Sequence, residues 1–103
     1  MSSYLNMLGL AFRAGKCSLG EEAIIREVQR KRAYLVLIAE DIGASTKKKM
    51  QDKCRSYEVD LRIVENRDVL SNAIGKTGRV AVAITDKGFA SKIKSMLDES
   101  IRG

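Results

Sequence analysis

Two short, uninterrupted runs of apolar residues constrain what this chain can fold into more than any other feature. They are residues 35–39, Leu-Val-Leu-Ile-Ala, and residues 80–84, Val-Ala-Val-Ala-Ile. A short continuous run of this kind is typical of a strand that is covered on both faces. Neither run approaches the ~20 apolar residues that a membrane helix needs. The sequence therefore predicts a small sheet with a layer on each face.

Most of the remaining chain has the periodicity of helices. Apolar residues recur at helical spacing in five segments, which we expect near 3–13, 20–31, 45–57, 69–74 and 89–97. A third and more exposed strand is predicted where Val59, Leu61 and Ile63 alternate with polar residues. Helices that alternate with short strands indicate an α/β fold, here a three-layer αβα sandwich around a small sheet.

Size and composition are those of a globular protein. The 103 residues fit one domain, which we expect to span 1–103, and 45% of them are hydrophobic and 31% charged. The apolar first 16 residues have no basic leader region and no small-residue cleavage site. We therefore expect them to form the first helix of a cytoplasmic protein that binds no membrane.

Residue types that carry catalysis or bind metals are scarce. The chain has no histidine, which excludes Ser-His and Cys-His nucleophile pairs. Cys17 and Cys54 form no CxxC pair, and two thiols are too few for zinc, so we expect them to be structural. Glu40 and Asp41 end the first apolar run, where they can cap helix ends or accept hydrogen bonds from loop amides. The sequence predicts no enzyme, no cofactor, no metal and no small-molecule substrate.

Positive charge is in excess and unevenly distributed along the chain. The net charge is +6, and residues 1–55 hold 11 basic and 6 acidic residues, against 8 and 7 in residues 56–103. A basic surplus on part of a small domain is the electrostatic footprint of a polyanion binder. Only five residues are aromatic and most occupy core-like helical positions, which disfavours base stacking on a face of the sheet.

In open α/β sheets, ligands bind where the loops gather beyond the carboxyl ends of the strands, and the first such loop covers residues 15–22. Ser18 and Glu21 have the spacing of a capping box, a purely structural role. Alternatively, exposed amides near Gly20 receive a phosphate or a base edge, and Arg26, about one turn further on, neutralises that phosphate.

The second candidate loop, residues 40–49, follows the first apolar run. Ser45 is a predicted N-cap, and it is followed by Lys47, Lys48 and Lys49. Cations in the first turn of a helix oppose its dipole and repel one another, which is tolerable if a polyanion lies nearby. A solvated basic face that serves solubility is the alternative.

The third candidate loop, residues 74–79, precedes the second apolar run. It contains Gly75, Lys76, Thr77 and Arg79. A nucleotide-binding P-loop is excluded, because Leu70 stands where that motif needs glycine and because the segment enters a strand rather than a helix. The loop is either a glycine-rich carrier of phosphate contacts or a plain turn from helix to strand.

Several motifs together resemble one known family. They are Gly15-Lys16 with Leu19-Gly20-Glu21-Glu22, the run 33–41, the segment 70–79, and the run 80–86 that ends in Thr-Asp. Over nearly the whole chain they resemble the kink-turn-binding ribosomal proteins of the L7Ae/L30e type, and residues 46–49 and 85–90 resemble its small bacterial YlxQ-like branch. The resemblance implies an αβα sandwich with a four-stranded mixed sheet. It also implies recognition of kinked ribosomal or regulatory RNA without catalysis.

The resemblance assigns roles to individual residues. Gly20 matches the glycine that opens the second helix in the family, and Arg26 matches a basic residue further along it. The polar pair with which the family reads sheared base pairs falls on Glu22 and Ala23, so this chain keeps a carboxylate and lacks its partner. Ser71 replaces a glycine of the family's pattern.

The predicted RNA-binding residues come from all three loops. They are Lys16, Gly20, Glu21, Glu22, Arg26, Asp41, Lys47, Lys48, Gly75, Lys76, Thr77 and Arg79. The alternative is a protein-interaction adaptor or regulator that presents the same basic loops to an acidic protein, which the altered pair Glu22-Ala23 favours.

Overall fold

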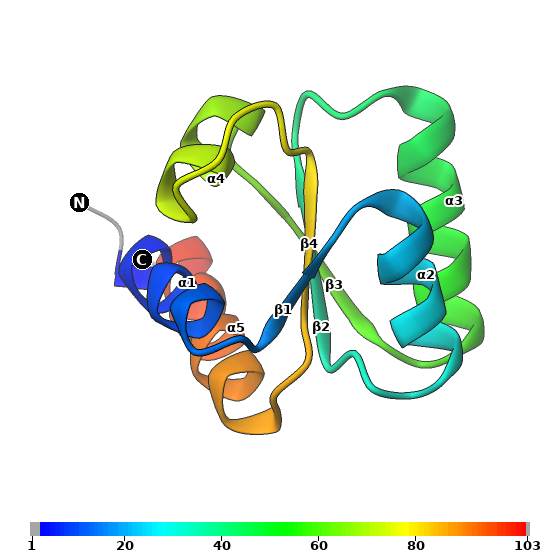
Figure 1. Ribbon diagram of the computed structural model, residues 1–103, viewed down its shortest axis with the longest axis horizontal. Helices are drawn as coiled ribbons and strands as arrows, with labels where there is room; N and C mark the ends of the chain where they lie inside the picture. Colours follow the sequence, from blue (N-terminus) through cyan, green and yellow to red (C-terminus); the bar gives the residue numbers. More distant parts are fainter. Residues whose placement is uncertain (1–2, 103) are drawn as a thin grey trace.

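A four-stranded mixed sheet lies between two layers of helices in the computed structural model, which describes residues 3–102 (Figure 1). The strands are β1 (Cys17–Leu19), β2 (Leu35–Ala39), β3 (Asp60–Val64) and β4 (Ala81–Ile84). The helices are α1 (Ser3–Arg13), α2 (Glu21–Gln29), α3 (Ala44–Ser56), α4 (Arg67–Ala73) and α5 (Lys87–Arg102). Helices α1, α4 and α5 cover one face, and α2 and α3 cover the other. The predicted αβα sandwich is confirmed.

The two apolar runs form the central strands of the sheet. The strand order is β1-β4-β2-β3; β4 is antiparallel to both β1 and β2, and β2 is parallel to β3. Leu35 is paired with Ile84 on one side and with Asp60 on the other. All five residues of β2 and all four of β4 are buried, as expected for strands covered on both faces.

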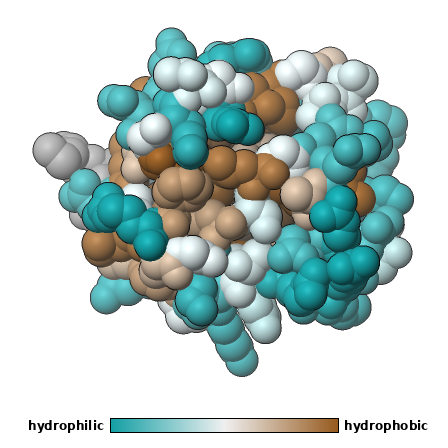
Figure 2. All heavy atoms as spheres, in the orientation of Figure 1, coloured by the Kyte–Doolittle hydropathy of each residue, from teal (hydrophilic) through white to brown (hydrophobic). Residues whose placement is uncertain are grey.

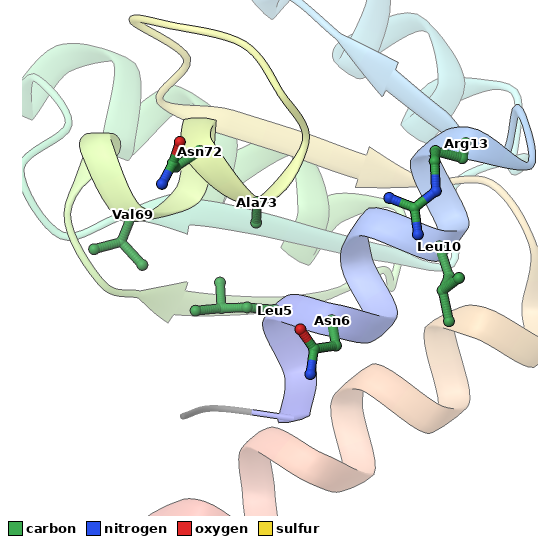
Figure 3. A pocket seen from close by; sticks show the side chains of 7 residues that line it. All are labelled: Leu5, Asn6, Leu10, Arg13, Val69, Asn72 and Ala73. Carbon is green, nitrogen blue, oxygen red and sulfur yellow. The ribbon is translucent and has the colours of Figure 1, made fainter.

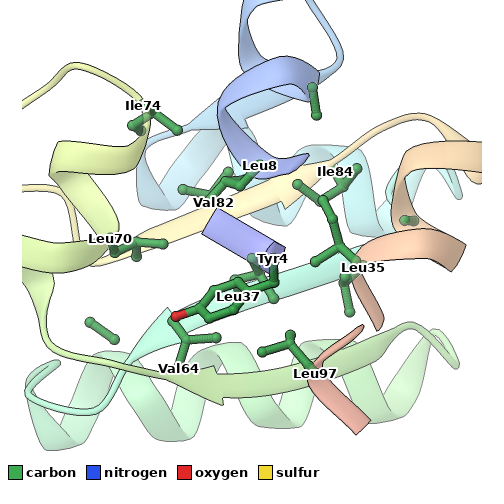
Figure 4. Packing of buried hydrophobic residues seen from close by; sticks show 14 residues of the cluster. Tyr4, Leu8, Leu35, Leu37, Val64, Leu70, Ile74, Val82, Ile84 and Leu97 are labelled. Carbon is green, nitrogen blue, oxygen red and sulfur yellow. The ribbon is translucent and has the colours of Figure 1, made fainter. Parts of the chain in front are cut away.

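Alternation along these strands divides the interior into two cores. Leu35, Leu37 and Ala39 point toward α1, α4 and α5, while Val36 and Ile38 point toward α2 and α3. Figure 4 shows the first core, where Leu8 of α1 and Leu70 of α4 meet the side chains of the sheet. Because successive strand residues face opposite ways, one five-residue run supplies both cores.

Two local predictions for the first loop are wrong. Residues 17–19 form β1 instead of a loop, and Ser18 pairs with Ala83 in the sheet, so it does not cap α2. The N-cap of α2 is Gly20, and no side chain caps that helix. β1 escaped prediction because it is three residues long and only half-buried, so its pattern is too short to have a period.

The other predicted elements occur within a few residues of their expected bounds. In the second loop, however, Ser45 is not the N-cap: α3 begins at Ala44, and Gly43 precedes it without a side-chain hydrogen bond. Within residues 3–102, no helix is both long enough and apolar enough to cross a membrane.

Candidate nucleic-acid interface

The three loops selected from the sequence lie at one end of the sheet. Parallel pairing matches Ala39 with Val64, and antiparallel pairing matches Leu19 with Val82 and Ile38 with Ala81. The carboxyl ends of β1, β2 and β3 therefore meet the start of β4, at the top of Figure 1. We call this the loop end: residues 20, 40–43, 65–66 and 74–80, with the first turns of α2 and α3.

Residues from all three predicted loops line one hollow at the loop end. Its volume is about 180 Å³. Its lining comprises Gly20, Glu21, Thr46, Met50, Gly78, Arg79, Val80 and Ala81. Because α2, α3 and the α4–β4 connection all contribute, this small concavity depends on the folded arrangement of segments that are far apart in sequence.

Two helices begin at this hollow without a side-chain cap. Gly20 precedes α2 and Gly43 precedes α3, and neither helix start receives a side-chain hydrogen bond. The first N–H groups of an α-helix have no partner within the helix, and together with the helix dipole they favour an anion. By contrast, the start of α4 is capped within the protein, because Asn66 accepts a hydrogen bond from the N–H of Val69.

Gly20 has a backbone conformation that requires glycine. Its φ of 91° and ψ of 139° lie where residues with a Cβ are strained, although no atom lies within 4 Å of the position that a Cβ would occupy. The backbone conformation of the turn, and not a close contact with another residue, therefore requires glycine at position 20. That turn leads directly from β1 into α2 and leaves the first amides of α2 uncovered.

The three lysines at the start of α3 have different environments. Lys49 forms an ion pair of 2.7 Å with Glu21 of α2, and this hydrogen bond raises the pKa of Lys49. Lys48 pairs with Asp52 within α3 at 3.2 Å. Lys47 is half-buried and has no ion pair among the described residues. Lys49 and Glu21 thus join the two helix starts, while Lys47 remains available to an external anion.

Asp41 supports the loop end from within. Its carboxylate accepts hydrogen bonds from the backbone N–H of Arg67 at 2.9 Å and from the Nε of Arg67 at 3.2 Å. Arg67 also donates from Nη2 to the carbonyl oxygen of Asp41 at 2.8 Å. Desolvation raises the pKa of Asp41, but the hydrogen bonds from Arg67 outweigh it and hold the pKa below its usual value. Asp41 therefore has a structural function, which joins the β2–α3 loop to α4.

The α4–β4 connection is held by a buried serine. Ser71 Oγ accepts a hydrogen bond from the N–H of Arg79 at 2.7 Å and donates one to the carbonyl oxygen of Arg79 at 3.0 Å. Gly75 and Gly78 have positive φ angles of 69° and 67°, which allow the chain to turn sharply within this connection. The side chain of Lys76 lies over the ring of Phe12, with Nζ 5.7 Å from the ring centroid. Thr77 and Arg79 are exposed.

Lys16 is separated from the other predicted site residues. It precedes β1, and its carbonyl oxygen accepts a hydrogen bond from the N–H of Thr85, just beyond the end of β4. This position is at the opposite end of the sheet from Gly20. The structure thus brings together, at the loop end, Gly20, Glu21, Glu22, Asp41, Lys47, Gly75, Lys76, Thr77 and Arg79, with Lys48 just beyond the first turn of α3. Arg26 lies further away, in the last turn of α2, and Lys16 lies at the opposite end of the sheet.

Sequence analysis overlooked four residues that build this end. They are Thr46, Arg67, Ser71 as a loop anchor, and Lys49 as the partner of Glu21. Thr46 and Lys49 flank the predicted residues Lys47 and Lys48, so their position at the start of the third predicted helix could have identified them from the sequence. No local pattern marks Arg67 or the hydrogen bonds of Ser71, because their partners are 26 and 8 residues away.

A larger hollow lies outside the loop end, between α1 and α4 (Figure 3). It measures about 560 Å³ and is lined by Leu5, Asn6, Leu10, Arg13, Val69, Asn72 and Ala73. Figure 2 shows hydrophobic residues over α1 and toward the middle of this face.

Burial raises the pKa of Cys17 to about 12 and that of Cys54 to about 11, so neither thiol is poised to react. Within residues 3–102, no group of three or more His, Cys, Asp or Glu residues is arranged to hold a metal ion.

Comparison with known proteins identifies the family. A model of the ribosomal protein L7Ae/L30e/S12e/Gadd45 family matches residues 3–94. This chain belongs to that family. The family is non-enzymatic, and the prediction that this chain is no enzyme is thereby confirmed.

Two bacterial members of the family are close to this chain in sequence. It is 51% identical over 92 residues to the RNA-binding protein YlxQ of Bacillus subtilis (strain 168), a match that covers 89% of this chain and 92% of the relative. It is 38% identical over 94 residues to the RNA-binding protein YlxQ of Enterococcus faecium, which covers 91% and 90%. The predicted resemblance to the YlxQ-like branch is thereby confirmed.

Two solved structures have the same fold as this chain. A protein of unknown function from Bacillus halodurans C superposes with a TM-score of 0.93 at 41% identity, over 95% of this chain and 99% of that chain. The Giardia lamblia 15.5kD RNA binding protein superposes with a TM-score of 0.77 at 16% identity, over 92% and 82%. At that identity the second likeness shows the fold alone.

Proposed function

We propose that this protein binds structured RNA that contains an internal kink, and that it does so through the loop end. The observation that carries the proposal is the convergence of two uncapped helix starts, those of α2 and α3, with the α4–β4 connection around one hollow. The two bacterial YlxQ relatives are named RNA-binding proteins, which supports RNA as the polyanion.

The chemistry of the loop end fits RNA that is distorted rather than regular duplex. The deep and narrow major groove of regular RNA admits no side chains, so proteins read shape, phosphates and bases that are splayed out of the helix. The amides that follow Gly20 and Gly43 suit phosphate oxygens. The exposed carboxylate of Glu22 suits an amino group on a base edge, since a carboxylate only accepts hydrogen bonds.

Cations around this centre serve as phosphate contacts. Arg26, Lys47 and Arg79 have no ion pair among the described residues, and they belong to α2, α3 and the α4–β4 connection, respectively. Lys48, Lys49 and Arg67 are already paired with carboxylates of the protein. We therefore assign phosphate neutralisation to Arg26, Lys47 and Arg79, with Lys76 as a further cation beside them.

A direct experiment compares a kink-turn duplex with an unkinked duplex of the same composition, measured by fluorescence anisotropy over a series of salt concentrations. We expect tighter binding to the kinked RNA. Arg26→Gln and Arg79→Gln should each weaken that binding and reduce the salt slope by roughly one, the value of one lost phosphate contact on duplex.

Lys92→Gln is the matched control, because Lys92 is exposed on α5, away from the loop end. It should leave both the preference for the kinked RNA and its salt slope unchanged. Equal or absent binding to the two duplexes would contradict the proposal and favour an adaptor that binds an acidic protein. An unchanged slope in both arginine variants would remove those arginines from the interface.

A further inference from the structure

The positive charge of the protein is greatest at the end of the sheet opposite the loop end. There the connections, residues 14–16, 30–34, 57–59 and 85–86, carry four basic and two acidic residues. The connections of the loop end, residues 20, 40–43, 65–66 and 74–80, carry two basic and three acidic residues. The surplus in the first half of the sequence therefore belongs largely to a surface that the proposed function leaves unused.

One row of the sheet brings this second surface together. Cys17, Ile84 and Leu35 stand side by side on β1, β4 and β2. Each of the two flanking strands is extended by one residue: the carbonyl oxygen of Lys16 accepts from Thr85 at 2.8 Å, and the N–H of Tyr34 donates to Ile84 at 2.9 Å. Neighbouring strands lie about 4.8 Å apart, so the Cα atoms of Lys16 and Tyr34 are separated by about 10 Å.

Tyr34 is an exposed aromatic side chain in the middle of these cations. It is 45% exposed, whereas Tyr4, Phe12, Tyr57 and Phe89 are buried or packed against the two cores. It lines a hollow of about 320 Å³ together with Lys87 and Lys94 of α5 and with Glu58 and Asp60. Asp60 pairs with Lys94 at 2.6 Å, so Lys87 is the lysine of this hollow that has no ion pair among the described residues. A half-exposed ring beside Lys87 offers a stacking surface for a base and charge for an adjoining phosphate.

We name this surface the basic end: Lys16, Arg30, Lys31, Arg32 and Lys87 around Tyr34. Arg32 is paired with Glu27 at 2.7 Å, while the other four cations have no ion pair among the described residues. Of the two acidic residues in the connections, Asp86 accepts a hydrogen bond at Oδ2 from the N–H of Phe89, while Glu58 is exposed and lines the hollow beside Tyr34. In Figure 2, hydrophilic residues cover the lower right of the view, over the end of α2 and the segment that follows it.

Helix stability explains most of these cations but not Lys87. A basic residue at a helix C-terminus is favourable to the dipole, which accounts for Arg30, the C-cap of α2, and for Lys31 and Lys16, whose N–H groups bond to the last carbonyls of α2 and α1. Lys87 instead opens α5, where the dipole disfavours a cation. This one cation therefore occupies a position that the secondary structure itself does not favour.

We propose that the basic end is a second RNA-binding surface, on which an unpaired nucleotide stacks on Tyr34 while the neighbouring phosphates pair with Lys16, Lys31 and Lys87. The choice of RNA as the polyanion rests on the proposed function. The two surfaces lie at opposite ends of strands of three to five residues, so one molecule can hold a kinked duplex and a single-stranded segment at the same time.

The experiment uses two probes, a twelve-nucleotide oligouridine and the kink-turn duplex, on the full chain. Amide chemical shifts should move at Lys16, Tyr34 and Lys87 with the oligouridine and around Gly20 and Arg79 with the duplex. Tyr34→Ala should weaken oligouridine binding about fivefold or more, and Tyr34→Phe should retain it, because stacking needs the ring and not the hydroxyl. The triple variant Lys16→Gln, Lys31→Gln, Lys87→Gln should lower the salt slope for the oligouridine by about two.

The matched control removes three positive charges from the loop end instead: Lys47→Gln, Lys76→Gln, Arg79→Gln. This control should leave the affinity for oligouridine unchanged. A melting curve of each variant confirms that it is folded. Oligouridine shifts confined to the loop end, or an unaltered affinity in Tyr34→Ala, would overturn the inference. So would equal binding of polyglutamate that is insensitive to Tyr34→Ala, which indicates an acidic protein partner. Failure with the kink-turn duplex alone contradicts the proposed function and leaves the oligouridine result intact.

Discussion

At the scale of single residues, the loop end is held by polar groups whose partners are remote in sequence. Ser71 is 2% exposed and is the one polar residue among the described residues that is fully buried. Its hydroxyl both donates to and accepts from the backbone of Arg79. This chain therefore stabilises its α4–β4 connection by a side-chain contact.

Replacement of Ser71 should therefore loosen the connection. Ser71→Ala removes both hydrogen bonds to Arg79, and we expect a loss of about 1–2 kcal/mol in the free energy of unfolding, measured by urea denaturation. Ser95→Ala, at an exposed position of α5, is the control and should change stability by less than about 0.5 kcal/mol. Equal effects in the two variants would show that the Ser71 contacts contribute nothing.

Asp41 should make stability depend on pH. Its pKa is below the usual value in the folded protein, so its stabilising effect is present above the unfolded pKa of ~3.9 and is lost as the pH falls through the lower folded value. Asp41→Asn should lower the Tm at pH 7, and the difference from the parent protein should vanish toward pH 2. Glu40→Gln is the control: its exposed side chain has no hydrogen bond among the described residues, so its Tm should stay close to that of the parent. If the Tm of Asp41→Asn stays below that of the parent protein at pH 2, the stabilisation by Asp41 does not come from its ionised carboxylate.

At the scale of elements, the distance between α1 and α4 is set by a glycine. Gly9 is buried, and a Cβ built on it would lie 2.9 Å from the carbonyl oxygen of Ala73. Since α4 leads directly into the α4–β4 connection, the packing of α1 also positions that part of the loop end. Lys76 over the ring of Phe12 forms a second contact between the same two regions.

We expect Gly9→Ala to destabilise the protein although alanine favours helices. The added methyl meets a backbone atom, and overpacking of this kind costs about 1–3 kcal/mol, more than the ~1 kcal/mol gained in helix propensity. Chemical denaturation measures the net loss, and amide shifts should change along α4. Lys92→Ala, exposed on α5, should stay within about 0.5 kcal/mol of the parent protein. If Gly9→Ala is more stable than the parent protein, α4 can move away from α1 without a loss in the free energy of unfolding.

At the scale of the whole molecule, a net charge of +6 does not identify the binding surface. The loop end combines open helix starts with nearly balanced charge, whereas the basic end combines excess cations with an exposed ring. Binding at the loop end should consequently rely on geometry in addition to its phosphate contacts. Binding at the basic end should rely on the ring of Tyr34 in addition to three phosphate contacts, each of which contributes less to the salt slope on a single strand than on a duplex.

Much of the fold could be predicted from the sequence because it depends on local patterns. The runs 35–39 and 80–84 and the helical periods specify buried strands and the helices that cover them. The loops around Gly20, the lysines of α3 and Gly75 could be selected for the same reason, since glycines and charges at element ends are visible along the chain. β1 and the ion pair of Lys49 with Glu21 could not, because each depends on a partner that only the folded chain supplies.

The amino-acid sequence alone determined the alternation of helices and strands, the burial of the central sheet and the surplus of positive charge, since these follow from which residues are neighbours along the chain. The tertiary structure decided which of these residues share a surface. Lys16 and Gly20 are four positions apart, yet an extended strand carries them to opposite ends of the sheet. Strand pairing, a long-range property, thereby divided one basic sequence into two surfaces of different chemistry.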